Sequence, residues 1–222
     1  WRHGSGKWPE YYTDTVPTTI DIGPGSPTGT VMGTGAKFPE RYQRAYFIND
    51  WPYGTMYAIH LKQEGATYTA TKEQFISGKP LPLTDVIIHT DGNMYFAVGG
   101  RRTASALYKV TYTGKESTKP VQAHKLNKDM LVRKDLEVLH TLPASKAIVD
   151  KAWPYLSNAD RFIRHAARVA IERQKTADWK NKLSSENNSW AIIEGACALA
   201  RMGEKADQSL ILKKLNQLDY AK

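Results

Sequence analysis

The sequence has a single cysteine, Cys197, among its 222 residues. One cysteine cannot form an intrachain disulfide, a cysteine-based zinc site or a c-type haem attachment motif within this stretch. Cys197 lies in the apolar segment AIIEGACALA. We therefore expect a small, buried hydrophobic side chain there, with a reactive thiol as the alternative.

Long apolar runs are also missing. No stretch approaches the roughly 20 apolar residues that span a bilayer, so no transmembrane segment is predicted. The opening, WRHGSGKWPEYYTD, lacks an initiator Met and the apolar core of a signal peptide. We expect this chain to be a piece of a longer protein, with more chain upstream, whose targeting this N-terminus does not reveal.

Acidic residues are fewer than basic ones, 22 against 31, which leaves a formal net charge of +9. Such an excess suits an acidic partner such as nucleic acid, an anionic glycan or a membrane surface. The alternative is a basic, solvated surface without a specific partner. The excess lies mainly after residue 114, and no dense Lys/Arg run alternates with aromatic residues. We therefore predict no nucleic-acid partner.

Motifs for metal, phosphate or nucleophilic chemistry are not found. The six histidines show no metal-ligand spacing, so no metal site is expected. The glycine-rich stretch GPGSPTGTVMGTG is followed by Lys37-Phe38-Pro39, where no helix start is predicted, and a phosphate cradle needs a following helix. Ser26 lacks the G-x-S-x-G pattern of a nucleophile elbow.

The stretch Leu81–Tyr112 carries the clearest pattern in the sequence. Short apolar strands are predicted at Thr84–His89, Met94–Val98 and Ala106–Tyr112, separated by turn residues and glycines. Evenly spaced short strands of this kind are typical of one four-stranded blade of a β-propeller. One blade cannot bury both faces, so it implies neighbouring blades.

A second blade is predicted upstream. Its four short strands are expected around Thr30–Met32, Gln43–Asn49, Gly54–Leu61 and Thr67–Ile76, with a weaker strand at Val16–Ile22. The prediction is therefore the C-terminal part of a propeller over residues 1–114, with blades at about 16–78 and 79–114. An aromatic cluster (Trp1, Trp8, Tyr11, Tyr12) is expected to cover an open blade edge.

The second half changes its hydrophobic period from 2 to 3.6 after a polar linker at 115–127. The region 128–222 is predicted as a HEAT-like α-helical domain of paired helices. Asp160 and Ser189 are the expected N-caps of two of them, and Pro154 is expected to kink or end another. The fold class is thus mixed, β then α: two four-stranded propeller-type blades followed by a helical domain.

Residues 17–112 resemble the last part of the soluble quinoprotein glucose and sorbosone dehydrogenase family of propellers. The resemblance rests on PTTIDIGPGSPTG, FPERYQRAYFINDWPYGTMYAIHL, LTDVIIHTDGNMYFAVGG and ALYKVTY. The whole chain is similar to the propeller plus HEAT-like region of large secreted planctomycete-type proteins labelled membrane-bound dehydrogenases. That resemblance implies a periplasmic or secreted location and, in many relatives, a c-type haem domain.

The resemblance does not carry the family's cofactor to this segment. In the family, a lysine and two arginines bind the carboxylates of pyrroloquinoline quinone (PQQ), and the matching positions here are Pro52, Pro82 and Thr84. None is basic, and a buried tricarboxylate needs cationic partners. We expect no cofactor in this segment, although Arg101 and Arg102 could supply charge from another loop.

Six residues are the ligand-binding candidates: Asp50, Trp51, Tyr53, Asp85, Arg101 and Arg102. They are expected on loops or strand ends at the top face of the propeller. An aromatic ring beside carboxylate and guanidinium groups suits a sugar. Ordinary packing of blade turns is the alternative.

Two functions follow as hypotheses. The first is a fragment of a secreted or periplasmic sugar-dehydrogenase-like propeller protein, whose parent passes electrons to a c-type cytochrome. The second is a non-catalytic module of degenerate blades and a helical repeat that binds a glycan or another protein. In both, this segment alone is not catalytic, and the remaining blades lie upstream or on another chain.

Overall fold

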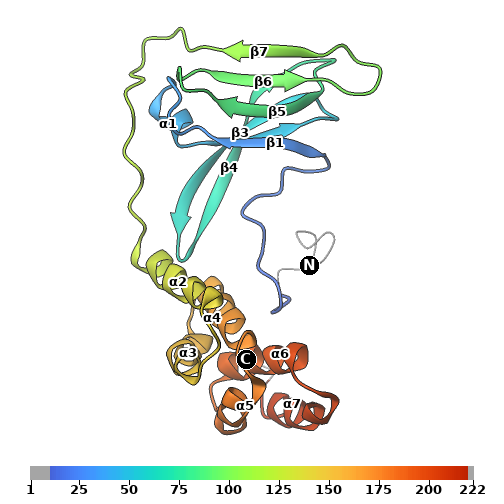
Figure 1. Cartoon of the computed structure of the whole chain (residues 1–222), viewed down its shortest axis with the longest axis vertical. Coiled ribbons are helices and arrows are strands. Elements are labelled where there is room, and N and C mark those ends of the chain that lie inside the picture. The colour runs from blue at the N-terminus through green and yellow to red at the C-terminus, as the bar shows by residue number, and fades with distance from the viewer. Residues whose placement is uncertain (1–10, 220–222) are drawn as a thin grey trace. The chain divides into compact units, whose positions relative to one another are not determined.

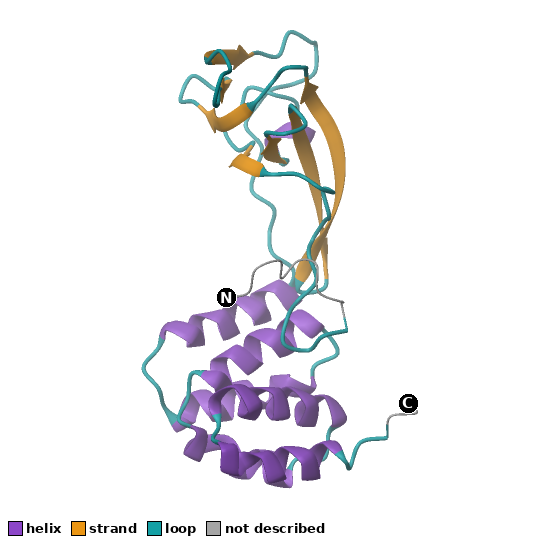
Figure 2. Cartoon of the chain, turned by 90° about the vertical axis from the view of Figure 1, so that its right-hand side faces the viewer, coloured by secondary structure: helices purple, strands orange, loops and turns teal. Residues whose placement is uncertain are grey.

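A computed structural model describes residues 11–219. These form two compact units. The sheet unit comprises Thr19–Glu64 and Tyr68–Lys125, and the helical unit comprises residues 11–18, Gly65–Thr67 and 126–219. Strands dominate the first unit and helices the second, which confirms the predicted order of β structure followed by α structure (Figures 1 and 2).

The first sheet is a four-stranded antiparallel meander in the order β1-β2-β3-β4. Its strands are β1 (Pro27–Met32), β2 (Tyr46–Asp50), β3 (Thr55–Glu64) and β4 (Thr67–Ser77). They match the four strands predicted for this stretch. The weaker strand predicted at Val16–Ile22 is wrong, because these residues form no regular element.

The second sheet has three strands among the described residues, in the order β5-β6-β7. They are β5 (Leu83–Ile88), β6 (Met94–Val98) and β7 (Ala106–Val110). The prediction of a fourth strand is wrong, because after Val110 the chain runs without regular structure until Lys128. The tight turn predicted between the first two strands is present: Gly92 has φ +80°.

The two sheets pack face to face through their first strands. Thr28 Oγ1 on β1 donates a hydrogen bond to the Leu83 carbonyl oxygen on β5, at 2.8 Å. A Cβ on Gly29 would lie 2.6 Å from Asp85 Cα, so the close approach of β1 and β5 requires glycine there. The side chains of both sheets form one buried core, which includes Phe47, Met56, Leu83, Val86, Met94 and Phe96.

A short helix, α1 (Glu40–Gln43), follows Pro39 and corrects the prediction that no helix starts there. It has only four residues: its N-cap Pro39 has no side-chain capping hydrogen bond, and its C-cap Arg44 is followed by Ala45 and then β2. The buried amide of Gln43 donates to the carbonyl oxygen of Lys119 at 2.9 Å and accepts from the backbone N–H of Val121 at 3.1 Å. The predicted linker is therefore fastened to the sheet unit over this stretch.

The helical unit contains six α-helices among its described residues. They are α2 (Lys128–Val138), α3 (Lys146–Ala152), α4 (Arg161–Glu172), α5 (Thr176–Ser185), α6 (Ser189–Met202) and α7 (Gln208–Leu215). A 3₁₀ helix over Trp153–Ser157 follows α3, as expected for the proline at position 154. Asp160 caps α4 as predicted, whereas Asn188, and not Ser189, caps α6 by accepting the Ala191 N–H.

The core of this unit is built from the apolar faces of its helices. Trp179, Leu156, Ile171 and Leu183 are fully buried in it. Alanines on α4 and α6 allow these two helices to approach closely, which explains the apolar alanine-rich pattern of the sequence. No helix within residues 11–219 is long and apolar enough to cross a membrane.

Candidate functional site

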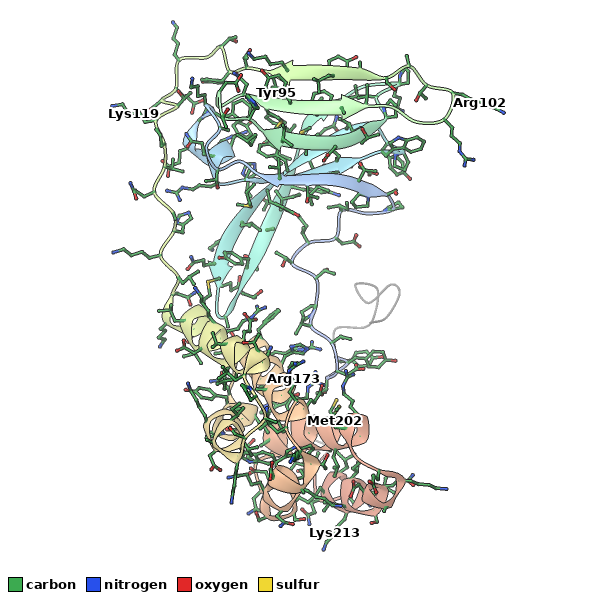
Figure 3. The ribbon with its side chains drawn as sticks, in the orientation of Figure 1. Tyr95, Arg102, Lys119, Arg173, Met202 and Lys213 are labelled. Atoms are coloured by element: carbon green, nitrogen blue, oxygen red, sulfur yellow. The ribbon has the colours of Figure 1, made fainter. Side chains whose placement is uncertain are left out.

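The predicted loops lie at one end of the two sheets. Asp50 is the last residue of β2, and Trp51–Tyr53 form the turn into β3. Arg101 and Arg102 lie in the connection from β6 to β7, at the same end (Figure 3). The structure therefore brings residues of both sheets together there, but the six candidates fall in different environments.

Trp51 is held rigidly while part of its ring remains exposed. Its Nε1 donates a hydrogen bond to the carbonyl oxygen of Gly99 at 2.9 Å. A Cβ on Gly100 would lie 2.9 Å from Trp51 Cζ2, so the backbone of the β6–β7 connection lies against the ring. The side chain is 38% exposed. A fixed, partly exposed indole is a ready stacking surface for a planar or sugar-ring face.

Arg101 and Arg102 occupy the corner of a tight turn beside Trp51. Both the N–H and the hydroxyl of Thr103 donate to the Gly100 carbonyl oxygen, at 3.4 and 3.1 Å. Both arginine side chains are exposed, and Figure 3 shows Arg102 pointing away from the sheets. Arg102 has φ +63° and is the one non-glycine residue with positive φ in the described chain. Such conformations cluster at functional loops.

Replacing Arg102 with glycine is expected to raise the free energy of unfolding of the sheet unit by about 0.5 kcal/mol. The left-handed conformation costs a residue with a Cβ about 1 kcal/mol, and the flexibility of glycine in the unfolded chain offsets part of that gain. Denaturant unfolding of the full chain, followed by tryptophan fluorescence, measures the change. A lower free energy of unfolding for Arg102→Gly would contradict this prediction. Arg101→Gly is the matched control: Arg101 has negative φ, so its replacement with glycine is expected to lower the free energy of unfolding.

Asp50 is buried and holds the loop that precedes β1. It is 1% exposed, and its Oδ1 accepts the Ser26 N–H at 3.1 Å. A Cβ on Gly25 would lie 2.5 Å from Asp50 Oδ2, so this loop lies directly over the carboxylate. Asp50 Oδ2 and both amide atoms of Asn49 are buried without a protein hydrogen-bond partner. Asp50 therefore supports the loop end and is not presented to a ligand at its surface.

Tyr53 and Asp85 line two separate shallow pockets. Tyr53 lies beside an open pocket of about 480 Å³ that is otherwise lined by polar residues and Tyr57. Asp85 lies on the face of β5 that carries Ile87, beside an apolar pocket of about 440 Å³. Its Oδ1 accepts the N–H of Val86 at 2.8 Å. Neither residue shares the environment of Trp51.

The positions that hold PQQ in the resembled family offer no cation here. Pro52 lies exposed in the β2–β3 turn, and Pro82 precedes β5. The hydroxyl of Thr84 donates to the Ala97 carbonyl oxygen at 3.1 Å, so it is used within the sheet. A tricarboxylate needs charged donors, and these three residues do not fit it.

The first sheet carries a polar cluster that was not predicted from the sequence. Glu73 accepts hydrogen bonds at 2.8 Å from Arg41, Tyr42 and His60. Burial acts to raise the pKa of Glu73, but the bonds from His60 and Tyr42 and the charge of Arg41 bring it below its usual value. Burial and the bond to Glu73 raise the pKa of Tyr42. The cluster fastens α1 to β4.

The helical unit contains a buried cluster of charged residues that was also not predicted from the sequence. Arg168 is 1% exposed, and its guanidinium lies 3.0 Å from Glu194 and 2.9 Å from Glu172. Arg164 lies 3.5 Å from Glu194 and stacks over the Trp190 ring at 3.9 Å. The sequence contained a signal for part of this cluster, because Arg164, Arg168 and Glu172 are spaced four residues apart and therefore lie on one face of a helix.

Comparison of the chain with protein-family models, curated proteins and solved structures gives no match. Within residues 11–219, no group of three or more histidine, cysteine, aspartate or glutamate side chains is placed to hold a metal ion.

Proposed function

We propose that this chain is part of a secreted or periplasmic β-propeller protein similar to the glucose and sorbosone dehydrogenases. Its two sheets are neighbouring blades, and its helical unit is HEAT-like. The role of this part is to bind carbohydrate at the loop end around Trp51, without chemistry of its own. Redox chemistry and electron transfer to a c-type cytochrome, where the parent has them, rest with residues outside this chain.

The arrangement of the sheets supports the propeller. Both are antiparallel meanders, and they pack face to face with their first strands side by side, as successive blades do around a propeller axis. The other face of the second sheet carries exposed apolar side chains: Ile87 is 50% and Leu107 is 71% exposed. An apolar sheet face of this kind suits a further blade as its cover, which is why we propose that the remaining blades are its partner.

The Trp51 ring, fixed by its bond to Gly99 beside the turn of Arg101 and Arg102, is the observation that carries the carbohydrate proposal. A sugar ring stacks on an indole through its apolar face, while guanidinium groups donate to hydroxyl or carboxylate oxygens at its edge. With two arginines and no exposed carboxylate in this turn, an acidic sugar such as a uronate suits the site best.

Titration calorimetry of the full chain with an oligouronate and with a neutral cello-oligosaccharide tests this proposal. We expect binding of the oligouronate, and Trp51→Ala is expected to weaken it at least about tenfold through loss of the stacking surface. Trp190→Ala is the matched control, because Trp190 is similarly exposed at 47% but lies in the helical unit. Binding of neither sugar, or equal affinities of wild type and Trp51→Ala, would overturn the proposal.

A further inference from the structure

The first described residues of the chain lie in the helical unit and are bound through their backbone. Arg161 Nη2 donates to the carbonyl oxygens of Tyr12 and Thr15, the latter at 2.8 Å. Arg168 Nη2 donates to the carbonyl oxygen of Thr13 at 3.3 Å. Three of four successive carbonyl groups are thus bound by two arginines of α4. We call residues 12–15 the strap.

The strap is a turn. The Thr15 N–H donates to the Tyr12 carbonyl oxygen at 3.4 Å, so the two carbonyl groups that Arg161 binds lie at the two ends of one turn. Arg168, two helical turns further along the same face of α4, binds the Thr13 carbonyl group within this turn. Hydrogen bonds from arginine to backbone carbonyl groups recognise the turned backbone and not one particular side chain.

The charge of the surface selects an acidic occupant. Asp14 lies between the anchored carbonyl groups of Thr13 and Thr15. Burial is the main cause of the raised pKa of the Cys197 thiol, and the negative charge of the Asp14 carboxylate adds to it. Arg168 Nη1 lies 3.2 Å from Cys197 Sγ. The guanidinium that contacts the thiol thus also holds the Thr13 carbonyl group, next to the acidic residue of the strap.

The aromatic side chains of this segment contribute little to holding it. Tyr11, next to the strap, is 78% exposed and Tyr12 is 37% exposed, so arginine hydrogen bonds to the backbone supply much of what holds the strap. Segments of that kind open locally at low free-energy cost.

We propose that the α4 face carrying Arg161 and Arg168 is a docking site for an acidic peptide in a turn conformation. The strap occupies it as a built-in ligand that an external peptide of the same chemistry replaces when the strap opens. This site is independent of the carbohydrate proposal, because its residues all belong to the helical unit.

Cys197 is a native reporter for this site, since it is the one cysteine of the sequence and lies beside Arg168. The experiment measures its alkylation rate by iodoacetamide in the full chain at neutral pH, by mass spectrometry. Asp14→Lys weakens the strap while leaving the docking face intact, and Arg161→Gln weakens the face itself. Both are expected to raise the rate about tenfold, Arg161→Gln because it loses the hydrogen bonds to Tyr12 and Thr15, and Asp14→Lys because it reverses the charge of the strap. Arg173→Gln, at the exposed end of α4, is the matched control and is expected to leave the rate unchanged (Figure 3).

The synthetic peptide PEYYTDTVPT, which is the sequence of residues 9–18, tests docking from outside. At about 1 mM it is expected to slow alkylation of the Asp14→Lys protein towards the wild-type rate, whereas the same peptide with lysine in place of its aspartate is not. Hydrogen exchange of the amides of residues 12–16 gives a second readout, expected to be faster in both variants. Unchanged alkylation and exchange in both variants, or no protection by the peptide, would overturn the proposal.

Discussion

Replacing Arg168 with methionine is expected to lower the free energy of unfolding of the helical unit by about 3 to 5 kcal/mol. The guanidinium is buried between Glu172 and Glu194, and its removal leaves two carboxylates with one fewer cation each. Breaking a buried ion pair costs about 3 to 5 kcal/mol. Arg164 stays 3.5 Å from Glu194 and Arg201 stays 3.1 Å from Glu172, which places this loss at the lower end of that range. Methionine keeps most of the volume, so packing changes little.

Thermal or urea unfolding of the full chain, followed by circular dichroism at the helical signal, measures this loss. Arg173→Met is the control, since Arg173 is the exposed C-cap of the same helix and its replacement is expected to change stability by less than about 0.5 kcal/mol. The double variant Arg168→Met with Glu194→Gln is expected to recover part of the loss, because it removes a buried carboxylate that has lost the nearer of its two cations. Equal stability of Arg168→Met and Arg173→Met would show that the cluster contributes nothing.

Lowering the pH from 7 to 4 is expected to destabilise the helical unit through His165 by about 3 kcal/mol. Burial, together with the charges of Arg168, Arg133, His140 and Arg161, lowers the pKa of His165 to about 4. An unperturbed histidine has a pKa of about 6.5, so the unfolded chain takes up the proton first as the pH falls. Stability from this group is complete above about pH 6.5 and is lost as the pH falls to about 4.

The comparison with His165→Gln isolates this effect. Carboxyl groups also titrate in this range, but they are the same in both proteins, so the difference between the two stability curves reports the histidine. We expect the curves to converge by about 3 kcal/mol between pH 7 and pH 4. Curves that stay parallel across this interval would mean that His165 titrates normally.

The strands and helices could be predicted because a local pattern within a short stretch of sequence indicates each of them. The alternation around Met94–Val98 and the turn before it predicted β6 with its observed bounds. The side chain of Asp160 predicted the start of α4, because an aspartate accepts the free N–H groups of a first turn. The errors lie where the local signal is weak: Val16–Ile22 is not a strand, and the second sheet has three strands.

The candidate site could be predicted only in part. The turn residues Trp51, Arg101 and Arg102 lie at the loop end, because turns follow strands and antiparallel strands bring alternate turns to one end of a sheet. Asp50 was expected to face a ligand and is instead buried under the loop before β1. Cys197 was expected to be a buried apolar side chain, and it is half-buried against the guanidinium of Arg168.

The sequence by itself thus determined the order of β and α structure, the approximate place of most strands and helices and the residues of the turns, because propensity, period and capping act over a few residues. Only the tertiary structure decided which distant side chains meet. The cluster of Arg168, Glu172 and Glu194, the bonds of His60 and Tyr42 to Glu73, and the strap on Arg161 each join residues from different elements. Their pairing depends on helix packing and strand register, which no local pattern specifies.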